Sequence, residues 1–378
     1  MTSKLPNVTT SIFAVMSKMA IDNNALNLSQ GYPNFESDPL LIELVAQAMK
    51  DGHNQYAPMP GDINLRKEIS KKMSRIYNKT YGPETEITIT AGATQAIFTA
   101  IASVVNKDDE VIIFTPAYDC YHPSIELFGG KVIPFQLEPP FFGVNWEGVS
   151  RLITNRTKLI IINTPHNPSG TVFSEEDMLE LQSLAEKHDL YVISDEVYEH
   201  IIFDDQTHFS AARFQSLSER TFITASFGKT FHNTGWKMGY CLAPSELMTE
   251  FKKVHQFNVF SVNHPIQKAL ATYLRTPEHY FGLSEFYQQK RDLFLDLIKD
   301  SRFKFVPSKG TYFQLLDYSE ITDENDRSFS ERLTKEYKVA TIPTSVFNVN
   351  NKDFKQLRVC FAKTDETIKN AAMIINSI

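Results

Sequence analysis

Four consecutive aliphatic residues, Leu159-Ile160-Ile161-Ile162, restrict the fold of this chain more than any other feature. A strand with one wet face alternates apolar and polar residues, so an unbroken apolar run indicates a strand covered on both faces. Another apolar run, Tyr191–Ile193, follows it after a stretch, Met178–Ala185, with the spacing of an amphipathic helix. This order predicts βαβ units, and therefore an α/β protein with a mixed, mainly parallel sheet flanked by helices.

Polar residues follow the predicted strands at the points where these strands end. The strands are expected at Ile87–Ile89, Val111–Phe114, Leu159–Ile162, Tyr191–Ile193 and Thr221–Ala225, and the residues that follow them include Thr94, Tyr118, Asn167, Asp195 and Ser226. In open α/β sheets, ligands bind outside the carboxyl ends of the strands. We therefore expect these five side chains to converge on one site.

The pattern changes after about residue 265, where long helices alternate with short strands. Helices are expected at Pro265–Arg275 and Leu283–Lys299, and short strands at Thr311–Leu315, Ala340–Ile342 and Leu357–Phe361. This predicts a smaller α+β domain formed by both termini. The expected division is an N-terminal arm with part of the small domain (1–50), a large domain (51–280) and a C-terminal small domain (281–378).

Composition excludes several classes of protein. A net charge of −7 offers no basic face for nucleic acid or an anionic membrane. The first ten residues lack the pattern of a signal peptide, and no apolar run is long enough to span a bilayer, so we expect a cytoplasmic protein. The cysteines and histidines show no metal-ligand spacing, so no metal site is expected.

Lys229 is the most informative single residue, because it lies between two apolar runs, Thr221–Ala225 and Tyr240–Leu242. A lysine is rarely buried without a partner. One that is held toward the interior can lose its proton and act as a nucleophile, as Schiff-base lysines do. A lysine that reaches the surface from a loop would also fit this position.

Pyridoxal phosphate is the cofactor that a Schiff-base lysine suggests, because its ring accepts electrons from the substrate. Its phosphate needs donors and positive charge, which the turn Gly92–Thr94, Ser226 and Lys237 can supply. Its ring nitrogen needs a carboxylate to stay protonated, and Asp195 follows a buried strand. Taken alone, each of these features also fits an ordinary turn or a helix cap.

The remaining needs of such a site concern the ring and the substrate. Tyr118 can stack on the ring, and Asn167 and Tyr198 can donate hydrogen bonds to its phenolic oxygen. A substrate carboxylate calls for a bidentate arginine, and Arg358 lies within the apolar strand Leu357–Phe361. A structural ion pair would also account for this arginine.

These residues stand in motifs that resemble a known family. Asn163–Gly170 (NTPHNPSG), Ser194–Tyr198 (SDEVY) and Ser226–Gly239 follow the order found in class I/II aminotransferases of fold type I, and Arg358 stands where that family keeps its carboxylate arginine. The resemblance extends from Gly31 to the C-terminus. The residues most similar to the methionine aminotransferase and kynurenine aminotransferase (glutamine transaminase K) branch are Gln55–Met59, Asp119–Tyr121 and Gly235–Lys237.

The resemblance implies a role for each residue. Lys229 would form the Schiff base and carry the proton between substrate and cofactor, with Asp195 at the pyridinium and Tyr198 at the phenolic oxygen as further catalytic residues. The cofactor would also contact Ala93, Thr94, Tyr118, Asn167, Ser226 and Lys237, the last replacing the arginine of the aspartate aminotransferase branch. Gly31, Asn167 and Arg358 would bind the substrate. Tyr56 would reach the phosphate in the neighbouring subunit, which implies a homodimer.

Other reactions and roles stay open at this level. A PLP-dependent C–S β-lyase acting on cysteine conjugates would use the same fold and residues as a ping-pong transaminase. Ser226-x-x-Lys229 also fits penicillin-recognising acyl enzymes, but these need a late Lys-Thr-Gly element that the sequence lacks. An aminotransferase-like half of a transcription factor would need a helix-turn-helix segment, and none precedes residue 30.

The identity of the substrate depends on weaker signals. A dicarboxylate would need a second cation, and Arg220 is the one arginine between Arg213 and Arg275. The segment His255–Phe260, with Tyr32, Tyr118 and Tyr121, would instead form an apolar and aromatic pocket. We therefore expect methionine or an aromatic amino acid as the donor, with kynurenine and glutamine as further donors, and a 2-oxo acid as the acceptor.

Overall fold

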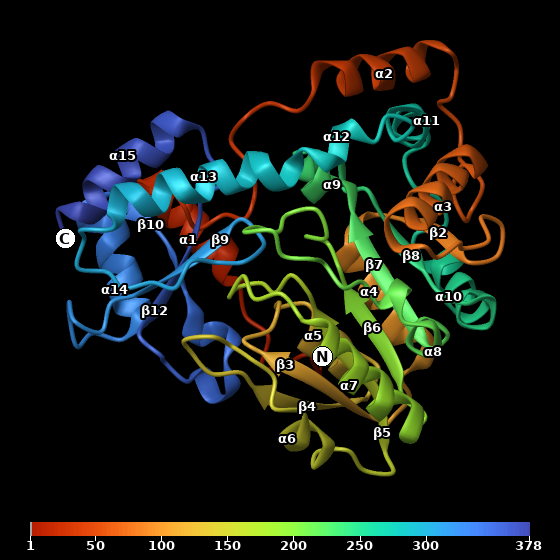
Figure 1. Cartoon of the computed structure of the whole chain (residues 1–378), viewed down its shortest axis with the longest axis horizontal. Helices are drawn as coiled ribbons and strands as arrows, with labels where there is room; N and C mark the ends of the chain where they lie inside the picture. Colours follow the sequence, from red (N-terminus) through yellow and green to blue (C-terminus); the bar gives the residue numbers. More distant parts are fainter. Residues whose placement is uncertain (1) are drawn as a thin grey trace.

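The computed structural model describes residues 2–378, and its largest sheet has seven strands. In chain order they are β2 (Ile87–Thr90), β3 (Glu110–Thr115), β4 (Lys131–Gln136), β5 (Thr157–Asn163), β6 (Tyr191–Asp195), β7 (Thr221–Ser226) and β8 (Gly239–Leu242). Their spatial order is β2-β8-β7-β6-β5-β3-β4 (Figure 1). Strand β8 runs antiparallel to both of its neighbours, whereas the other pairs are parallel. The predicted α/β fold with a mainly parallel sheet is confirmed.

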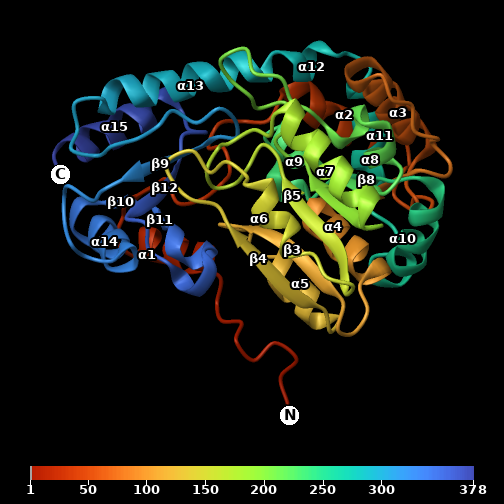
Figure 2. The ribbon, with the colours of Figure 1, turned by 60° about the horizontal axis from the view of Figure 1, so that its bottom comes forward.

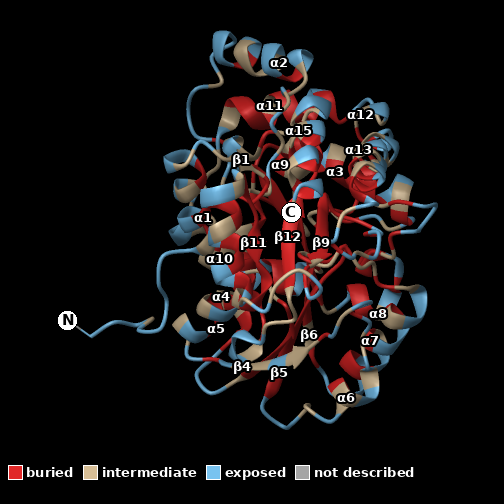
Figure 3. Cartoon of the chain, turned by 90° about the vertical axis from the view of Figure 1, so that its left-hand side faces the viewer, coloured by how far each residue is buried: buried red, intermediate tan, exposed pale blue. Residues whose placement is uncertain are grey.

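Both faces of this sheet are covered, as the apolar run in β5 predicts. Leu159 and Ile161 belong to one core, and the alternate residues Ile160 and Ile162 belong to another. The first core includes residues of α4 (Gly92–Val104), α5 (Tyr121–Leu127) and α10 (Ser245–Asn258). The second includes residues of α3 (Ile63–Tyr77), α6 (Trp146–Ser150), α7 (Glu175–Lys187) and α8 (Gln215–Ser218). Figure 3 shows the buried strands between helices with exposed outer surfaces.

A smaller unit combines elements from both ends of the chain. Its antiparallel sheet has the order β11 (Ile342–Pro343), β12 (Gln356–Cys360), β9 (Phe313–Asp317), and a separate parallel pair joins β1 (Leu26–Asn27) to β10 (Val339–Ala340). The helices are α1 (Ile12–Asp22), α13 (Leu283–Ile298), α14 (Asp326–Arg332) and α15 (Asp365–Asn376). Figure 2 shows α1 among the C-terminal elements. The small α+β unit from both termini agrees with expectation, while the boundaries at residues 50 and 280 stay a prediction.

Other helices connect these units or lie outside the sheet. Helix α2 (Pro39–Lys50) packs against α11 (His264–Tyr273), and α12 (Glu278–Phe281) directly precedes α13. Within residues 2–378, no helix combines the length and apolar character needed to cross a membrane.

Two local predictions need correction near the strand ends. Helix α4 begins at Gly92, so the expected turn Gly92–Thr94 belongs to the helix, because the left-handed φ of Gly92 (78°) lets the chain turn from β2 directly into the helix. Ala93 and Thr94 therefore lie in its first turn. Lys229 lies on the short helix α9 (Phe227–Thr230), so the alternative of a lysine carried by a loop does not apply. Three predicted site residues, Ala93, Thr94 and Lys229, therefore have a helical backbone.

Candidate active site

A close approach between β8 and α4 builds the floor of the site. A Cβ atom added at Gly239 would lie 2.6 Å from the carbonyl oxygen of Ala225, 2.9 Å from the carbonyl carbon of Gly92 and 3.0 Å from the nitrogen of Ala93. Only glycine can therefore occupy position 239 without moving the backbone. The approach brings the start of α4 and the end of β7 around one cavity, whose lining includes Gly92, Ala93, Thr94, Ser226 and Lys237.

This part of the cavity can bind an anion. In the part of the chain that the structure describes, no side chain caps the first turn of α4, so the N–H groups there lack a side-chain acceptor. The N-terminus of a helix carries partial positive charge. The ammonium group of Lys237 lies beside it, 3.7 Å from the position that a Cβ atom on Gly92 would take. The predicted phosphate-binding residues are therefore brought together.

Asp195 is a buried carboxylate at the end of β6. Tyr121 donates a hydrogen bond of 2.5 Å from its hydroxyl to Oδ2, and the N–H of Val197 donates to Oδ1 at 3.4 Å. Among residues 2–378, no lysine, arginine or histidine lies within ion-pair distance of this carboxylate. Burial raises the pKa of Asp195 to about 6, although the bond from Tyr121 opposes the shift. A cation from a bound ligand would stabilise the ionised form.

Asn167, Tyr198 and Tyr118 line the same cavity. The Oδ1 atom of Asn167 accepts a hydrogen bond of 2.9 Å from Arg358, which leaves its Nδ2 group without an acceptor in the described chain. The hydroxyl of Tyr118 lies 3.4 Å from Oγ1 of Thr94, beside the anion-binding end of the cavity. Burial raises the pKa of Tyr118 and of Tyr198, so both phenols stay neutral donors.

A buried ion pair anchors the loop that carries Tyr198. The next residue, Glu199, has its Oε1 atom 2.5 Å from Nζ of Lys72 on α3, and its Oε2 atom accepts from Tyr77 at 2.7 Å. Burial alone would raise the pKa of Glu199, but Lys72 lowers it to about 2, so the carboxylate stays ionised. The loop after β6 is thereby held against α3.

Arg358 is buried in β12, with 1% of its surface exposed. Its Nη1 group donates to Oδ1 of Asn167 and its Nη2 group donates to the carbonyl of Ser29, each at 2.9 Å, while Nε has no partner among residues 2–378. The guanidinium lies 3.9 Å from the ring centroid of Phe313. No carboxylate within residues 2–378 forms an ion pair with it, so the structural ion pair considered above is absent from that part of the chain. A ligand carboxylate would supply the missing anion.

The amine of Lys229 faces the same cavity from α9. It donates to the carbonyl of Gly31 at 2.9 Å and to the hydroxyl of Tyr312 at 2.8 Å. Burial lowers its pKa from 10.5 to about 8. At pH 7 about a tenth of such an amine is neutral, against roughly one part in 3,000 at the ordinary value. The lysine is therefore available as a base and nucleophile near neutral pH.

Gly31 completes the part of the cavity next to Arg358. A Cβ atom there would lie 2.7 Å from Cζ of Phe313, so the chain passes this ring closely only because residue 31 is glycine. The cavity brings together ten of the predicted residues: Gly31, Ala93, Thr94, Tyr118, Asn167, Asp195, Tyr198, Ser226, Lys237 and Arg358, around Lys229.

Several predicted aromatic residues lie elsewhere. The expectation that Tyr121 lines a substrate pocket is wrong, because its hydroxyl is bonded to Asp195 beneath the cavity. Tyr32, Phe257 and Phe260 lie outside the cavity of their own chain, and Phe257 is 87% exposed at the end of α10. Tyr56 is 81% exposed and also lies outside it, so its contact with a neighbouring subunit stays a prediction.

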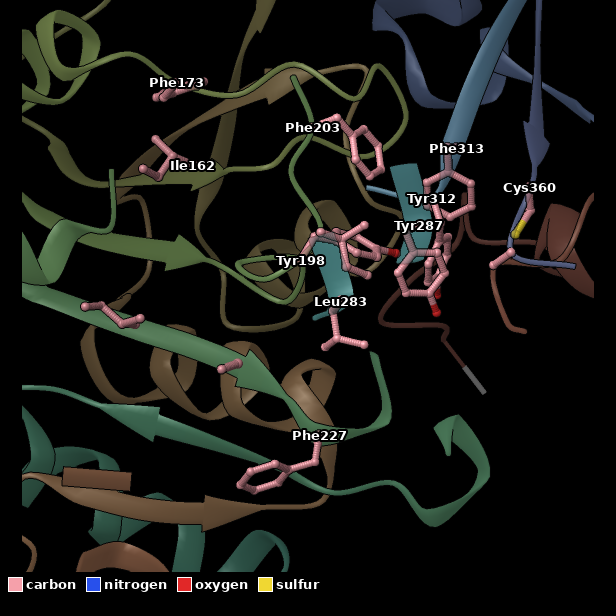
Figure 4. Close-up of a cluster of buried hydrophobic side chains, with 14 of the residues drawn as sticks. Ile162, Phe173, Tyr198, Phe203, Phe227, Leu283, Tyr287, Tyr312, Phe313 and Cys360 are labelled. Atoms are coloured by element: carbon pink, nitrogen blue, oxygen red, sulfur yellow. The ribbon is translucent and has the colours of Figure 1, made fainter. Parts of the chain in front are cut away.

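Sequence reasoning missed three aromatic residues at the site. Phe13 of α1 and Phe313 of β9 line the cavity, and Tyr312 bonds to Lys229. The strand predicted at Thr311–Leu315 contains Tyr312 and Phe313. Its apolar pattern does not show which of its faces contacts Lys229, which lies 83 positions earlier in the chain. Figure 4 shows Tyr312 and Phe313 with Tyr198 and Tyr287 in one aromatic cluster.

Comparisons with known proteins agree with this arrangement. The family model described as "Aminotransferase class I and II" matches residues 23–375. The methionine aminotransferase of Escherichia coli is 47% identical over 98% of this chain and 96% of its own, and a kynurenine–oxoglutarate transaminase of Dictyostelium discoideum is 35% identical over 96% and 92%.

A solved structure gives the same result for the fold. The crystal structure of YbdL from Escherichia coli, for which a methionine aminotransferase function was identified, superposes with a TM-score of 0.98 at 46% identity and covers 100% of this chain and 99% of its own. The family and the branch expected from the sequence motifs are both confirmed. The chain belongs to the aminotransferase class I and II family and is an aminotransferase.

Proposed function

We propose that this aminotransferase uses pyridoxal phosphate to move the amino group of methionine or an aromatic amino acid to a 2-oxo acid. Two unpaired buried charges in one cavity carry this proposal: among residues 2–378, no cation lies within ion-pair distance of Asp195 and no carboxylate lies within ion-pair distance of Arg358. A protonated pyridine ring and a substrate carboxylate would supply the missing partners. The uncapped start of α4 beside Lys237 provides a place for the phosphate.

The residues then have separate tasks. Bound pyridoxal phosphate would supply an aldehyde that reacts with amines and a ring that accepts electrons from the substrate. Asp195 would hold the proton on the ring nitrogen, and Asn167 and Tyr198 would bind the phenolic oxygen. Arg358 orients the substrate by its carboxylate, with the N–H of Gly31 as a second donor. Lys229 takes the proton from the substrate Cα and returns it during transfer.

The apolar character of the cavity favours methionine and aromatic donors. Phe13, Tyr118 and Phe313 contribute rings to its lining, whereas its cations are Lys229, Lys237 and Arg358, each with a task assigned above. No cation is left among the described lining residues for a second carboxylate. Transamination is favoured over the C–S lyase reaction because the relatives reported above are transaminases.

Single-turnover half-reactions test this preference. The visible absorbance of the loaded enzyme is followed after mixing with methionine, phenylalanine, kynurenine, glutamine or aspartate, with alanine as the control that has a minimal side chain. We expect methionine and phenylalanine to react at least about tenfold faster than aspartate, because an unpaired carboxylate is costly to bury. A faster reaction with aspartate would refute the proposed substrate class.

A homodimer is the second part of the proposal. Tyr56 and Phe260 pack edge to face at 5.4 Å, Met49 lines the same surface hollow as Tyr56, and all three side chains are exposed. Exposed aromatic patches of this kind mark interaction surfaces. We propose that a second copy of the chain covers it and that Tyr56 reaches the phosphate of that copy.

Complementation tests the contribution of Tyr56. Lys229→Ala and Tyr56→Ala subunits are assembled together at equal amounts. If Tyr56 acts across the interface, each hybrid dimer contains one native site, and random assembly gives about a quarter of wild-type activity. If Tyr56 acts within its own subunit, no hybrid site is native and the mixture stays at the level of the separate variants, which would rule out the exchange.

A further inference from the structure

Two hydrogen bonds fix the position of the amine of Lys229 in this structure. Its two hydrogen-bond partners in the described chain, the carbonyl of Gly31 at 2.9 Å and the hydroxyl of Tyr312 at 2.8 Å, both belong to the small unit. The hydroxyl of Tyr312 in turn donates to the carbonyl of Gly31 at 2.5 Å. Three polar atoms thus form a closed triangle between the two units.

In this triangle, each hydrogen bond has a defined donor and a defined acceptor. The single hydroxyl proton of Tyr312 is used in its bond to Gly31, so its oxygen accepts a hydrogen bond from Lys229. Burial raises the pKa of Tyr312 well above 10, which keeps this phenol protonated. A neutral amine has two N–H groups and one lone pair. With both N–H groups directed to Tyr312 and Gly31, the lone pair lies on the remaining side of the nitrogen.

Tyr312 is held firmly in this position. It is fully buried, and its ring packs edge to face against Tyr198 at 5.2 Å and Phe313 at 5.0 Å (Figure 4). The preceding residue, Thr311, has a left-handed φ of 65°, which is unfavourable for a β-branched side chain. Its N–H donates to the carbonyl of Ile201 at 2.8 Å. Such strain persists only where the surroundings impose it, as at functional sites.

We propose that Tyr312 is a positioning residue for Lys229. Together with the carbonyl of Gly31, the hydroxyl of Tyr312 holds the free amine in place. It thereby directs the lone pair of the nitrogen toward the substrate Cα for proton transfer. This inference rests on the proposed function, in which Lys229 carries that proton. It explains why the lysine points toward the Gly31 and Arg358 end of the cavity, where the substrate carboxylate is expected.

Tyr312→Phe tests the proposal because it removes the acceptor and keeps the ring. Tyr287→Phe is the matched control: Tyr287 is also fully buried, its ring lies 5.8 Å from that of Tyr312, and its hydroxyl bonds to His232 at 2.8 Å and not to Lys229. The half-reaction is followed with the amino acid that wild type converts fastest, with hydrogen or deuterium at Cα. Tyr312→Phe should slow it about 10- to 100-fold and raise the deuterium isotope effect, while KM changes less than about threefold.

A second measurement uses the cofactor-free protein and needs no turnover. Lys229 is reductively methylated over a range of pH, and the modified peptide is quantified by mass spectrometry. Hydrogen-bond acceptors favour the protonated amine, so removing one should shift the pH midpoint of labelling down by about one unit in Tyr312→Phe. Tyr287→Phe should keep the wild-type profile.

The possible results separate this inference from the proposed function. Equal half-reaction rates and equal labelling profiles in the two variants would overturn the role of Tyr312. A slower reaction with an unshifted labelling profile would also overturn it, because that pattern belongs to altered packing. A wild-type protein that does not attach pyridoxal phosphate to Lys229 would instead refute the proposed function itself.

Discussion

Replacing Lys229 with alanine should reduce transamination by at least about 10⁴-fold, because the variant loses both the amine that holds the cofactor and the base that moves the proton. The visible absorption of the lysine-bound cofactor should disappear as well. The fold should persist, since the amine of Lys229 contributes two hydrogen bonds and no ion pair within residues 2–378. Single-turnover absorbance and circular dichroism measure these effects.

Lys237→Gln is the matched control, because Lys237 lines the same cavity beside the predicted phosphate site. This variant should bind the cofactor more weakly but recover turnover when pyridoxal phosphate is added in excess. Excess cofactor should not rescue Lys229→Ala. Appreciable transamination by Lys229→Ala would contradict the assignment of the lysine.

Replacing Arg358 with leucine should raise KM by about 100-fold for every amino acid donor. The reason is that, among the described residues that line the cavity, the guanidinium is the cation with no other assigned role, so it is left to bind the carboxylate that all donors share, and losing a buried charged partner costs about 2–5 kcal/mol. Arg358→Lys keeps the charge but loses the planar fork, so its KM should lie between those of wild type and Arg358→Leu. Initial-rate measurements with several donors give the comparison.

Arg291→Leu controls for the removal of a buried arginine. Arg291 is 4% exposed but lies outside the cavity, where it pairs with Asp204 and Asp292. This variant should lower the melting temperature and leave KM near the wild-type value. An increase in KM confined to one donor in Arg358→Leu would show that Arg358 recognises a side chain instead of the common carboxylate.

The sequence allowed the sheet and the strand-end residues to be predicted because their determinants are local. An unbroken apolar run such as Leu159–Ile162 marks a doubly covered strand, and the residue that ends a parallel strand must lie at the ligand-binding edge. Asp195 and Asn167 were found in this way. Arg358 was found because a charged residue in an apolar strand is conspicuous.

The sequence did not reveal contacts that depend on the packing of the two units. Tyr312 meets Lys229 across the cavity, and Tyr121 meets Asp195 from a helix on another part of the sheet. A tyrosine in an apolar stretch is predicted to belong to the hydrophobic core, and the sequence does not show whether its hydroxyl also bonds to a functional residue. The start of α4 at Gly92 was not predicted, because a glycine can adopt the left-handed φ of a turn either just before a helix or as the first residue of the helix.

The most direct test of the central claim is to locate the cofactor on the chain. The loaded protein is reduced with borohydride, digested with trypsin and analysed by mass spectrometry. We predict that the added mass of the pyridoxyl phosphate group lies on Lys229, in the peptide from Thr221 to Lys237 with one missed cleavage. Active protein that carries this mass on another lysine, or on none, would contradict the account.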